Sequence, residues 1–155
     1  MPFKYKLLNM FREFLVYHSH SLEFRAKLIT LMVLSDDKIS ECEEEMIKKI
    51  AHKIYPKDYN RAEVLVETVH EYYEKIKTQN NLDYESLITE IIKDLKQKPR
   101  FVQKIDTNLL REFEKCQTNE EERIFQERII EFLEYLKKEY SQKGLNEKLQ
   151  IFNKR

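Results

Sequence analysis

The sequence predicts an all-α fold, a compact bundle of about seven helices. Apolar residues recur at spacings of three and four along most of the chain, as they do on the buried face of a helix. The 155 residues include one glycine and three prolines, too few to supply the tight turns that join β-strands. Charged residues make up 36% of the chain, which is typical of helices with solvated outer faces.

The helical pattern divides into consecutive segments separated by caps and helix breakers. In chain order they cover Lys4–Tyr17, Leu22–Leu34, Ser40 to just before Pro56, Asn60–Lys77, Tyr84–Lys96, Thr107–Cys116 and Thr118–Ser141. The second segment is apolar nearly all round from Leu28 onward, the pattern of a helix surrounded by others. We therefore expect it to form the centre of the core, with Leu31 fully buried.

Capping signals set several of these boundaries. Ser40 and Glu43 have the spacing of a capping box, in which each side chain bonds the other residue's backbone amide. The pairs Asn60/Glu63 and Thr118/Glu121 predict two further helix starts. Gly144 predicts the end of the last long helix, because glycine favours the C-cap position.

Chain length favours a single domain. We expect an all-helical domain over residues 1–142. The remaining residues, 143–155, have two interpretations: a further short helix or a frayed C-terminal tail.

Charge and cysteine content limit the classes of function. Lys plus Arg and Asp plus Glu number 28 each, for a formal net charge of zero, which argues against a dedicated nucleic-acid binder. Cys42 and Cys116 lack CxxC spacing, so we expect free thiols in a reducing compartment. With no signal-peptide pattern and no apolar run long enough to cross a bilayer, the expected location is the cytoplasm, without membrane association.

An acidic turn separates the second and third predicted helices. Asp36, Asp37, Glu41 and Glu43 are its candidate ligand residues. Divalent cations such as calcium prefer several oxygen ligands, so the turn is a candidate cation site. Carboxylates at a helix start are also favoured by the unpaired amides and the helix dipole, and this structural role is the leading interpretation.

The same turn resembles a motif of the TerB-like family, named for tellurite resistance. The spacing Asp-x-x-Ile-x-x-x-Glu is present at Asp36, Ile39 and Glu43, and the similarity covers Leu28 to about Ile54. The chain departs from the family at Asp37, where glycine is usual. The resemblance implies an all-helical fold and, for some members, divalent cations held by acidic surface residues.

Tyrosines near the third and fourth helices are the candidate partner-binding residues. They are Tyr55, Tyr59, Tyr72 and Tyr73. Tyrosine suits a binding surface because its ring is apolar while its hydroxyl can stay hydrated. The alternative is that these rings form the rim of an ordinary core.

The predicted function is a non-catalytic, cytoplasmic helical binding or scaffold module for a protein partner, with the link to stress that the TerB-like resemblance implies. The alternative is a calcium-type cation-binding protein that uses the acidic turn at residues 36–43. No nucleophile, base or phosphate-binding loop forms a catalytic arrangement in the sequence. We therefore expect no enzymatic activity and no cofactor other than that cation.

Overall fold

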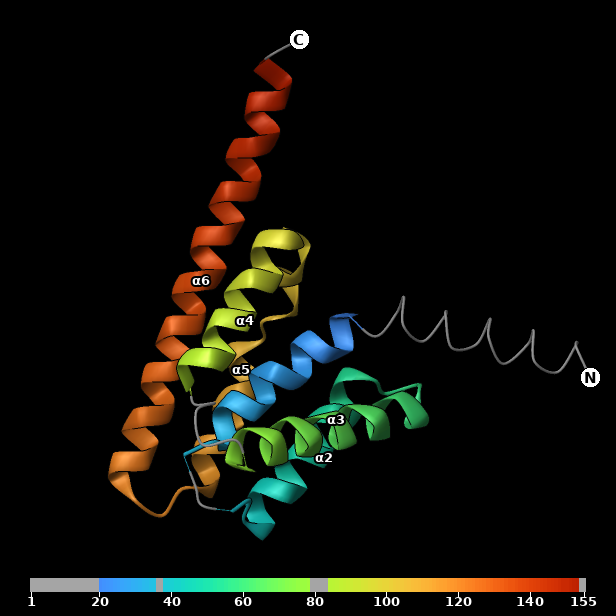
Figure 1. The fold of residues 1–155 in the computed structure, drawn as a ribbon, viewed down its shortest axis with the longest axis vertical. Helices are drawn as coiled ribbons and strands as arrows, with labels where there is room; N and C mark the ends of the chain where they lie inside the picture. Colours follow the sequence, from blue (N-terminus) through green and yellow to red (C-terminus); the bar gives the residue numbers. More distant parts are fainter. Residues whose placement is uncertain (1–19, 36–37, 79–83, 154–155) are drawn as a thin grey trace, which may run out of the picture.

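The computed structural model describes residues 20–35, 38–78 and 84–153, with side chains described as far as Ser141. The predicted helix over Lys4–Tyr17 lies outside this part of the chain. A helix covers residues 20–33. It is followed by α2 (Glu41–Ile54), α3 (Tyr59–Thr78), α4 (Tyr84–Gln97), η1 (Pro99–Lys104), α5 (Thr107–Leu110), η2 (Arg111–Cys116) and α6 (Glu120–Asn153). The described residues contain no strand, and the predicted all-α bundle is confirmed (Figure 1).

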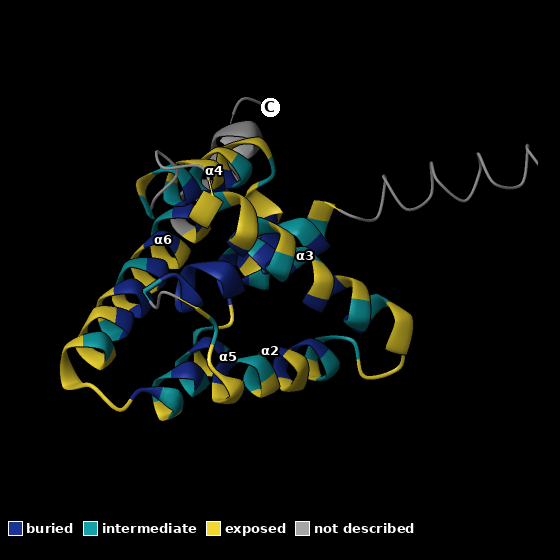
Figure 2. Ribbon diagram, turned by 60° about the horizontal axis from the view of Figure 1, so that its bottom comes forward, coloured by how far each residue is buried: buried dark blue, intermediate teal, exposed yellow. Residues whose placement is uncertain are grey.

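The helix over residues 20–33 forms the centre of the core, as predicted. Every residue from Leu28 to Leu34 is buried, and Leu31 has no exposed surface. Figure 2 shows the buried residues on the sides of the helices that face the interior, with exposed residues on the outer faces. Since residues 28–34 are buried on all sides of the helix, the position of this half is set mainly by the hydrophobic effect.

Two long polar side chains secure the end of this central helix. Gln126, from α6, donates to the carbonyl of Met32 at 2.9 Å, and Lys77, from α3, donates to the carbonyl of Leu34 at 3.0 Å. The last carbonyls of a helix have no partner within the helix. These contacts satisfy two carbonyls at this end and tie the central helix to both α3 and α6.

The predicted capping box opens α2. The Ser40 hydroxyl accepts from the Glu43 amide at 3.1 Å, and the Glu43 carboxylate accepts from the Ser40 amide at 3.1 Å. The helix ends at Ile54, immediately before Tyr55 and Pro56. The sequence prediction for both ends of this helix is confirmed.

Replacing Ser40 by alanine tests this boundary. The substitution removes the acceptor for the Glu43 amide, so we expect Ser40→Ala to lower the free energy of unfolding by about 1 kcal/mol. Urea denaturation of the two proteins measures the difference. Ser40→Asn retains a side-chain acceptor and should recover most of the loss; equal stability of the wild type and the alanine variant would contradict this role.

The helices α2 and α3 form an antiparallel pair. His52 contacts Glu63 at 2.9 Å near the turn, and His70 contacts Glu44 at 2.8 Å farther from it. The cap of α3 differs from the predicted Asn60/Glu63 pair. Asp58 accepts from the Arg61 amide at 3.0 Å, because the helix begins one residue earlier, at Tyr59.

Three further boundaries differ from prediction. The segment expected to be one helix over Thr107–Cys116 consists of α5 followed by the 3-10 helix η2. At the start of α6, Asn119 rather than Thr118 accepts from the Glu121 amide, at 2.8 Å. The predicted C-cap at Gly144 is wrong, since α6 continues through this residue to Asn153. Glycine disfavours a helix by only about 1 kcal/mol, which good helix-forming neighbours can offset.

The prediction of two free thiols is also wrong. Cys42, in the first turn of α2, and Cys116, at the end of η2, form a disulfide between Cα atoms 5.5 Å apart. The residues that follow the two cysteines are also in contact. Gln117, next to Cys116, donates a hydrogen bond to the buried carboxylate of Glu43, next to Cys42, at 3.5 Å. Disulfides persist in oxidising environments and are rare in the cytosol. The cysteines therefore give no support to the expectation that the protein resides in a reducing compartment.

Candidate binding surfaces

The acidic turn lies only partly within the described residues. Asp36 and Asp37 are outside them. Glu41 is exposed, whereas Glu43 is fully buried and points away from solvent. The Glu43 carboxylate accepts from Ser40 through one oxygen and from Gln117 through the other. Its position is explained by capping and by this buried contact.

No group of three or more His, Cys, Asp or Glu side chains suited to a metal ion occurs among the described residues. The cation site at Asp36, Asp37, Glu41 and Glu43 remains a prediction, because two of its four residues are not described. Within the same described part, no helix is both long and apolar enough to cross a membrane.

The four candidate tyrosines do not form one surface. Tyr59 is 70% exposed and its ring centre lies 5.1 Å from that of His52. Tyr72 and Tyr73 lie about 20 Å farther along α3, at about 1.5 Å of rise per residue. Tyr73 is buried in the core, which leaves little of its ring for a partner.

Tyr72 is half-buried beside several carboxylates. Burial raises the pKa of its hydroxyl well above the usual value, and the charges of Glu23, Glu90 and Asp94 raise it further. The Asp94 carboxylate itself pairs with Lys27 at 2.7 Å. Tyr72 therefore serves as a packing residue between helices rather than as an exposed binding residue.

Tyr55 has a different environment from the other three tyrosines. The guanidinium carbons of Arg25 and Arg61 lie 5.4 and 5.0 Å from its ring centre. These distances are within the range of cation–π contacts. Tyr55 therefore brings together two cations from separate helices.

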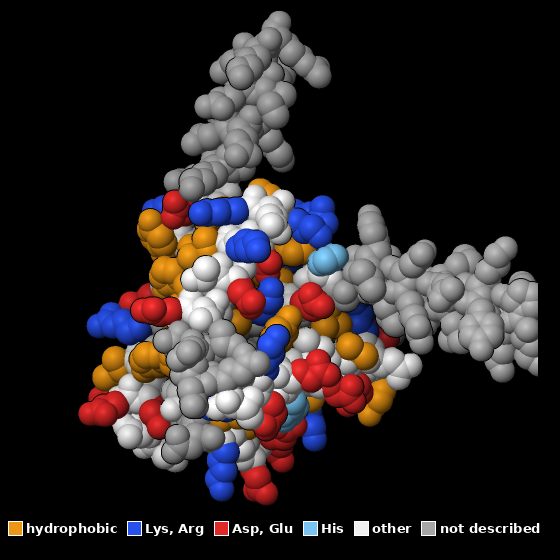
Figure 3. Space-filling view, in the orientation of Figure 1, with side chains coloured by type: hydrophobic (Ala, Val, Ile, Leu, Met, Phe, Trp, Pro, Cys, Tyr) orange, Lys and Arg blue, Asp and Glu red, His pale blue; other side chains and the backbone are white. Residues whose placement is uncertain are grey.

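A row of aromatic side chains follows the junction of α4 and α6. The ring centres of Tyr84 and Phe125 are 4.9 Å apart in an edge-on contact, and those of Phe132 and Tyr135 are 6.5 Å apart. Phe125 is 41% and Tyr135 60% exposed. We call Tyr84, Phe125, Phe132 and Tyr135 the aromatic row. Apolar side chains gather on this side of the molecule in Figure 3.

The aromatic row was not predicted, although α6 contains a signal for it. Ile129, Ile130, Leu133 and Leu136 form the expected inward stripe and are all buried. Phe125, Phe132 and Tyr135 are additional apolar residues at spacings of seven and three, and so share a second face. Phe132 packs partly against the core, whereas Phe125 and Tyr135 keep much of their surface exposed.

A pair of carboxyl groups joins η2 to α6. Burial raises the pKa of Glu114 to about 7, and its hydrogen bond to Glu127 and the charge of Glu127 act in the same direction. The pKa of Glu127 is lowered, first by the hydrogen bond from Glu114 and then by Arg111. Glu114 is therefore the group that holds the proton between them.

This pair predicts a dependence of stability on pH. Glu114 has a higher pKa in the folded chain than its ordinary 4.5, so its stabilising effect is complete below that value and is lost as the pH rises through about 7. Glu114→Gln keeps a hydrogen-bond donor without the charge. We expect this variant to be more stable than the wild type at pH 8, by under about 1 kcal/mol because solvent screens the pair.

Urea denaturation at pH 5 and pH 8 measures the effect. The gain from Glu114→Gln should be near zero at pH 5, where the wild-type carboxyl is already protonated. Glu67→Gln removes an exposed carboxylate from α3 and is the matched control. The same gain at both pH values would contradict the shared proton.

Comparisons with protein-family models, curated proteins and solved structures find no match for this chain. The TerB-like resemblance therefore rests on the motif at Asp36, Ile39 and Glu43. The candidate surfaces rest on the geometry of the described residues.

Proposed function

We propose that the chain is a non-catalytic helical binding module whose aromatic row holds a protein partner. The observation that carries this proposal is the exposure of Phe125 and Tyr135 on the outer side of a well-packed bundle. A soluble helix places such rings in water at a cost in free energy, because their apolar surface remains hydrated. A partner that covers them recovers this free energy.

The shape of the surface favours a helical segment as the partner. Three rings of the row lie on α6 and the fourth, Tyr84, lies at the start of α4. An amphipathic helix can place its apolar side chains along such a surface. Aromatic residues are enriched in the centres of protein interfaces, where a few of them provide most of the binding free energy. The TerB-like resemblance adds a role in a stress response to this proposal.

Site-specific photo-crosslinking tests the location of the interface. A photoreactive phenylalanine analogue is placed at position 125, in the aromatic row, and in a separate protein at position 64. Val64 is 49% exposed on α3 and is the control. We expect a discrete cross-linked protein adduct in native cells only from position 125. Equal adducts from both positions, or none from position 125, would refute the proposed surface.

A further inference from the structure

Five cations from three parts of the chain lie close together at one end of the bundle. Arg25 comes from the helix over residues 20–33, and Arg61 comes from α3. Lys98, Arg100 and Lys104 belong to η1 and the residue preceding it. We call these five residues the cationic cluster. The cationic cluster is separate from the aromatic row. An inference about the cluster therefore does not depend on the function proposed for the aromatic row.

Two aromatic rings organise the cluster. Arg25 and Arg61 both lie over Tyr55, as described above. Lys98 and Arg100 lie over the ring of Phe101, with the ammonium nitrogen 5.5 Å and the guanidinium carbon 5.7 Å from its centre. Each ring therefore collects two cations, and cation–π attraction offsets part of their mutual repulsion.

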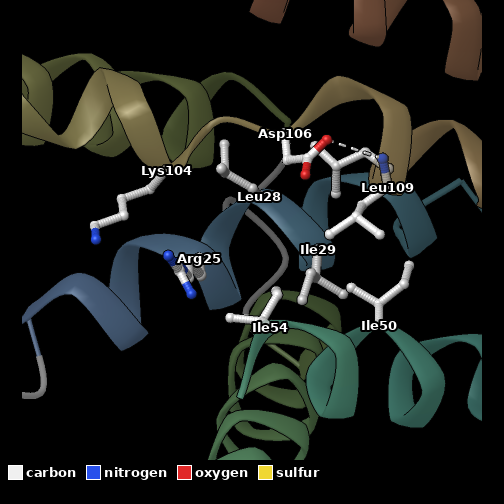
Figure 4. Close-up of a pocket in the computed structure, with 9 residues that line it drawn as sticks. Arg25, Leu28, Ile29, Ile50, Ile54, Lys104, Asp106 and Leu109 are labelled. Carbon is white, nitrogen blue, oxygen red and sulfur yellow. Dashed lines mark hydrogen bonds between the residues drawn. The ribbon is translucent and has the colours of Figure 1, made fainter. Parts of the chain in front are cut away.

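Lys104 connects the two pairs. Burial lowers the pKa of its ammonium group, and the charges of Arg25, Arg61 and Arg100 lower it further. Figure 4 shows the side chains of Lys104 and Arg25 at the same end of a small apolar pocket. This gathering of like charges costs free energy, and a bound anion would remove that cost.

Two of the neighbouring carboxylates form contacts elsewhere, and a third, Glu23, lines an adjoining hollow together with Lys98. Asp106 accepts from the Leu109 amide at 3.2 Å and points away from Lys104 and Arg25 in Figure 4. Asp94 pairs with Lys27. Within residues 20–35, 38–78 and 84–141, no carboxylate forms an ion pair with Arg25, Lys98, Arg100 or Lys104.

A surface hollow adjoins the cationic cluster. The hollow has a volume of about 340 Å³ and is lined by Lys98, Arg100 and Lys104, together with His20, Gln103 and Phe101. Among the residues that the structure describes, no carboxylate lines it. Its volume is at the lower end of the range for small-molecule sites, roughly 300–1,000 Å³. The apolar pocket in Figure 4, at about 20 Å³, has room for no more than a water molecule.

We propose that the cationic cluster binds a multivalent phosphate group carried by a small soluble molecule. Arginine matches phosphate through paired N–H donors, and lysine adds a mobile point charge. Several cations around one hollow suit a ligand with several charges on neighbouring oxygens. A nucleic-acid backbone instead needs an extended basic strip, and this chain has a formal net charge of zero.

Calorimetric titration with inorganic tripolyphosphate tests the proposal, with ionic strength held constant by sodium chloride. The variant Arg100→Gln/Lys104→Gln removes two cations that line the hollow. The matched control Lys48→Gln/Lys137→Gln removes two exposed cations outside it, for the same change in net charge. Circular dichroism establishes that all three proteins are folded.

We expect saturable binding to the wild type and to the control, and a loss of affinity of about tenfold or more in the cluster variant. Equal affinity in both variants, or no binding to the wild type, would overturn the proposal. A second titration uses a single-stranded thymidine dodecamer. Tighter binding of this oligonucleotide than of tripolyphosphate, with loss in the same variant, would also overturn it and assign the cluster to nucleic acid.

Discussion

Leu31→Ala is expected to lower the free energy of unfolding by about 2–5 kcal/mol, the range for a buried leucine truncated in a packed core. Leu31 has no exposed surface and lies on the helix around which the others pack. Since neighbouring helices enclose it, the cavity left by the substitution cannot collapse easily. Urea denaturation followed by circular dichroism measures the change.

Val64→Ala is the control for this measurement. Val64 is 49% exposed on α3, so its truncation should change the free energy of unfolding by no more than about 0.5 kcal/mol. A loss below about 0.5 kcal/mol for Leu31→Ala would mean that the helix over residues 20–33 is not central to the core.

Reduction of the disulfide is expected to destabilise the fold by about 2–4 kcal/mol. Cys42 and Cys116 are separated by 74 positions, and a cross-link over a long loop restricts the unfolded chain more than a short one does. The loss is not expected to abolish folding, because a chain of this length has an extensive core of its own. Denaturation with and without dithiothreitol measures the effect.

The double variant Cys42→Ser/Cys116→Ser separates the disulfide from other effects of the reductant. It should unfold at the same urea concentration with or without dithiothreitol, and at the concentration found for the reduced wild type. Two reactive thiols in the unreduced, denatured wild-type protein would contradict the disulfide.

Local signals explain which parts of the fold were predictable. The box at Ser40 and Glu43 and the apolar run from Leu28 are encoded by neighbouring residues, and both are present in the structure. Gly144 was misread because a glycine also occurs inside a helix when its neighbours favour the helix. The disulfide was missed because spacing along the chain does not reveal a pair of cysteines that only tertiary packing brings together.

The candidate surfaces were less predictable than the fold for the same reason. The tyrosine prediction grouped residues by sequence proximity, whereas burial places Tyr73 in the core and leaves Tyr59 exposed. The cationic cluster combines side chains from three elements. Only the cations in η1 and at the residue before it form a pattern that is visible in the local sequence. Between Leu95 and Ile105 the chain carries cations and no carboxylate, a bias that neutral overall composition conceals.

The central claim, that the aromatic row is a protein-binding surface, is tested most directly by quantitative affinity purification from native cells. Three baits are compared: the wild type, Phe125→Ser/Tyr135→Ser, and Tyr59→Ser as an exposed-tyrosine control. The proposal predicts a protein that is enriched on the wild type and on Tyr59→Ser and is lost from the double variant. The same proteins in the same amounts on all three folded baits would contradict it.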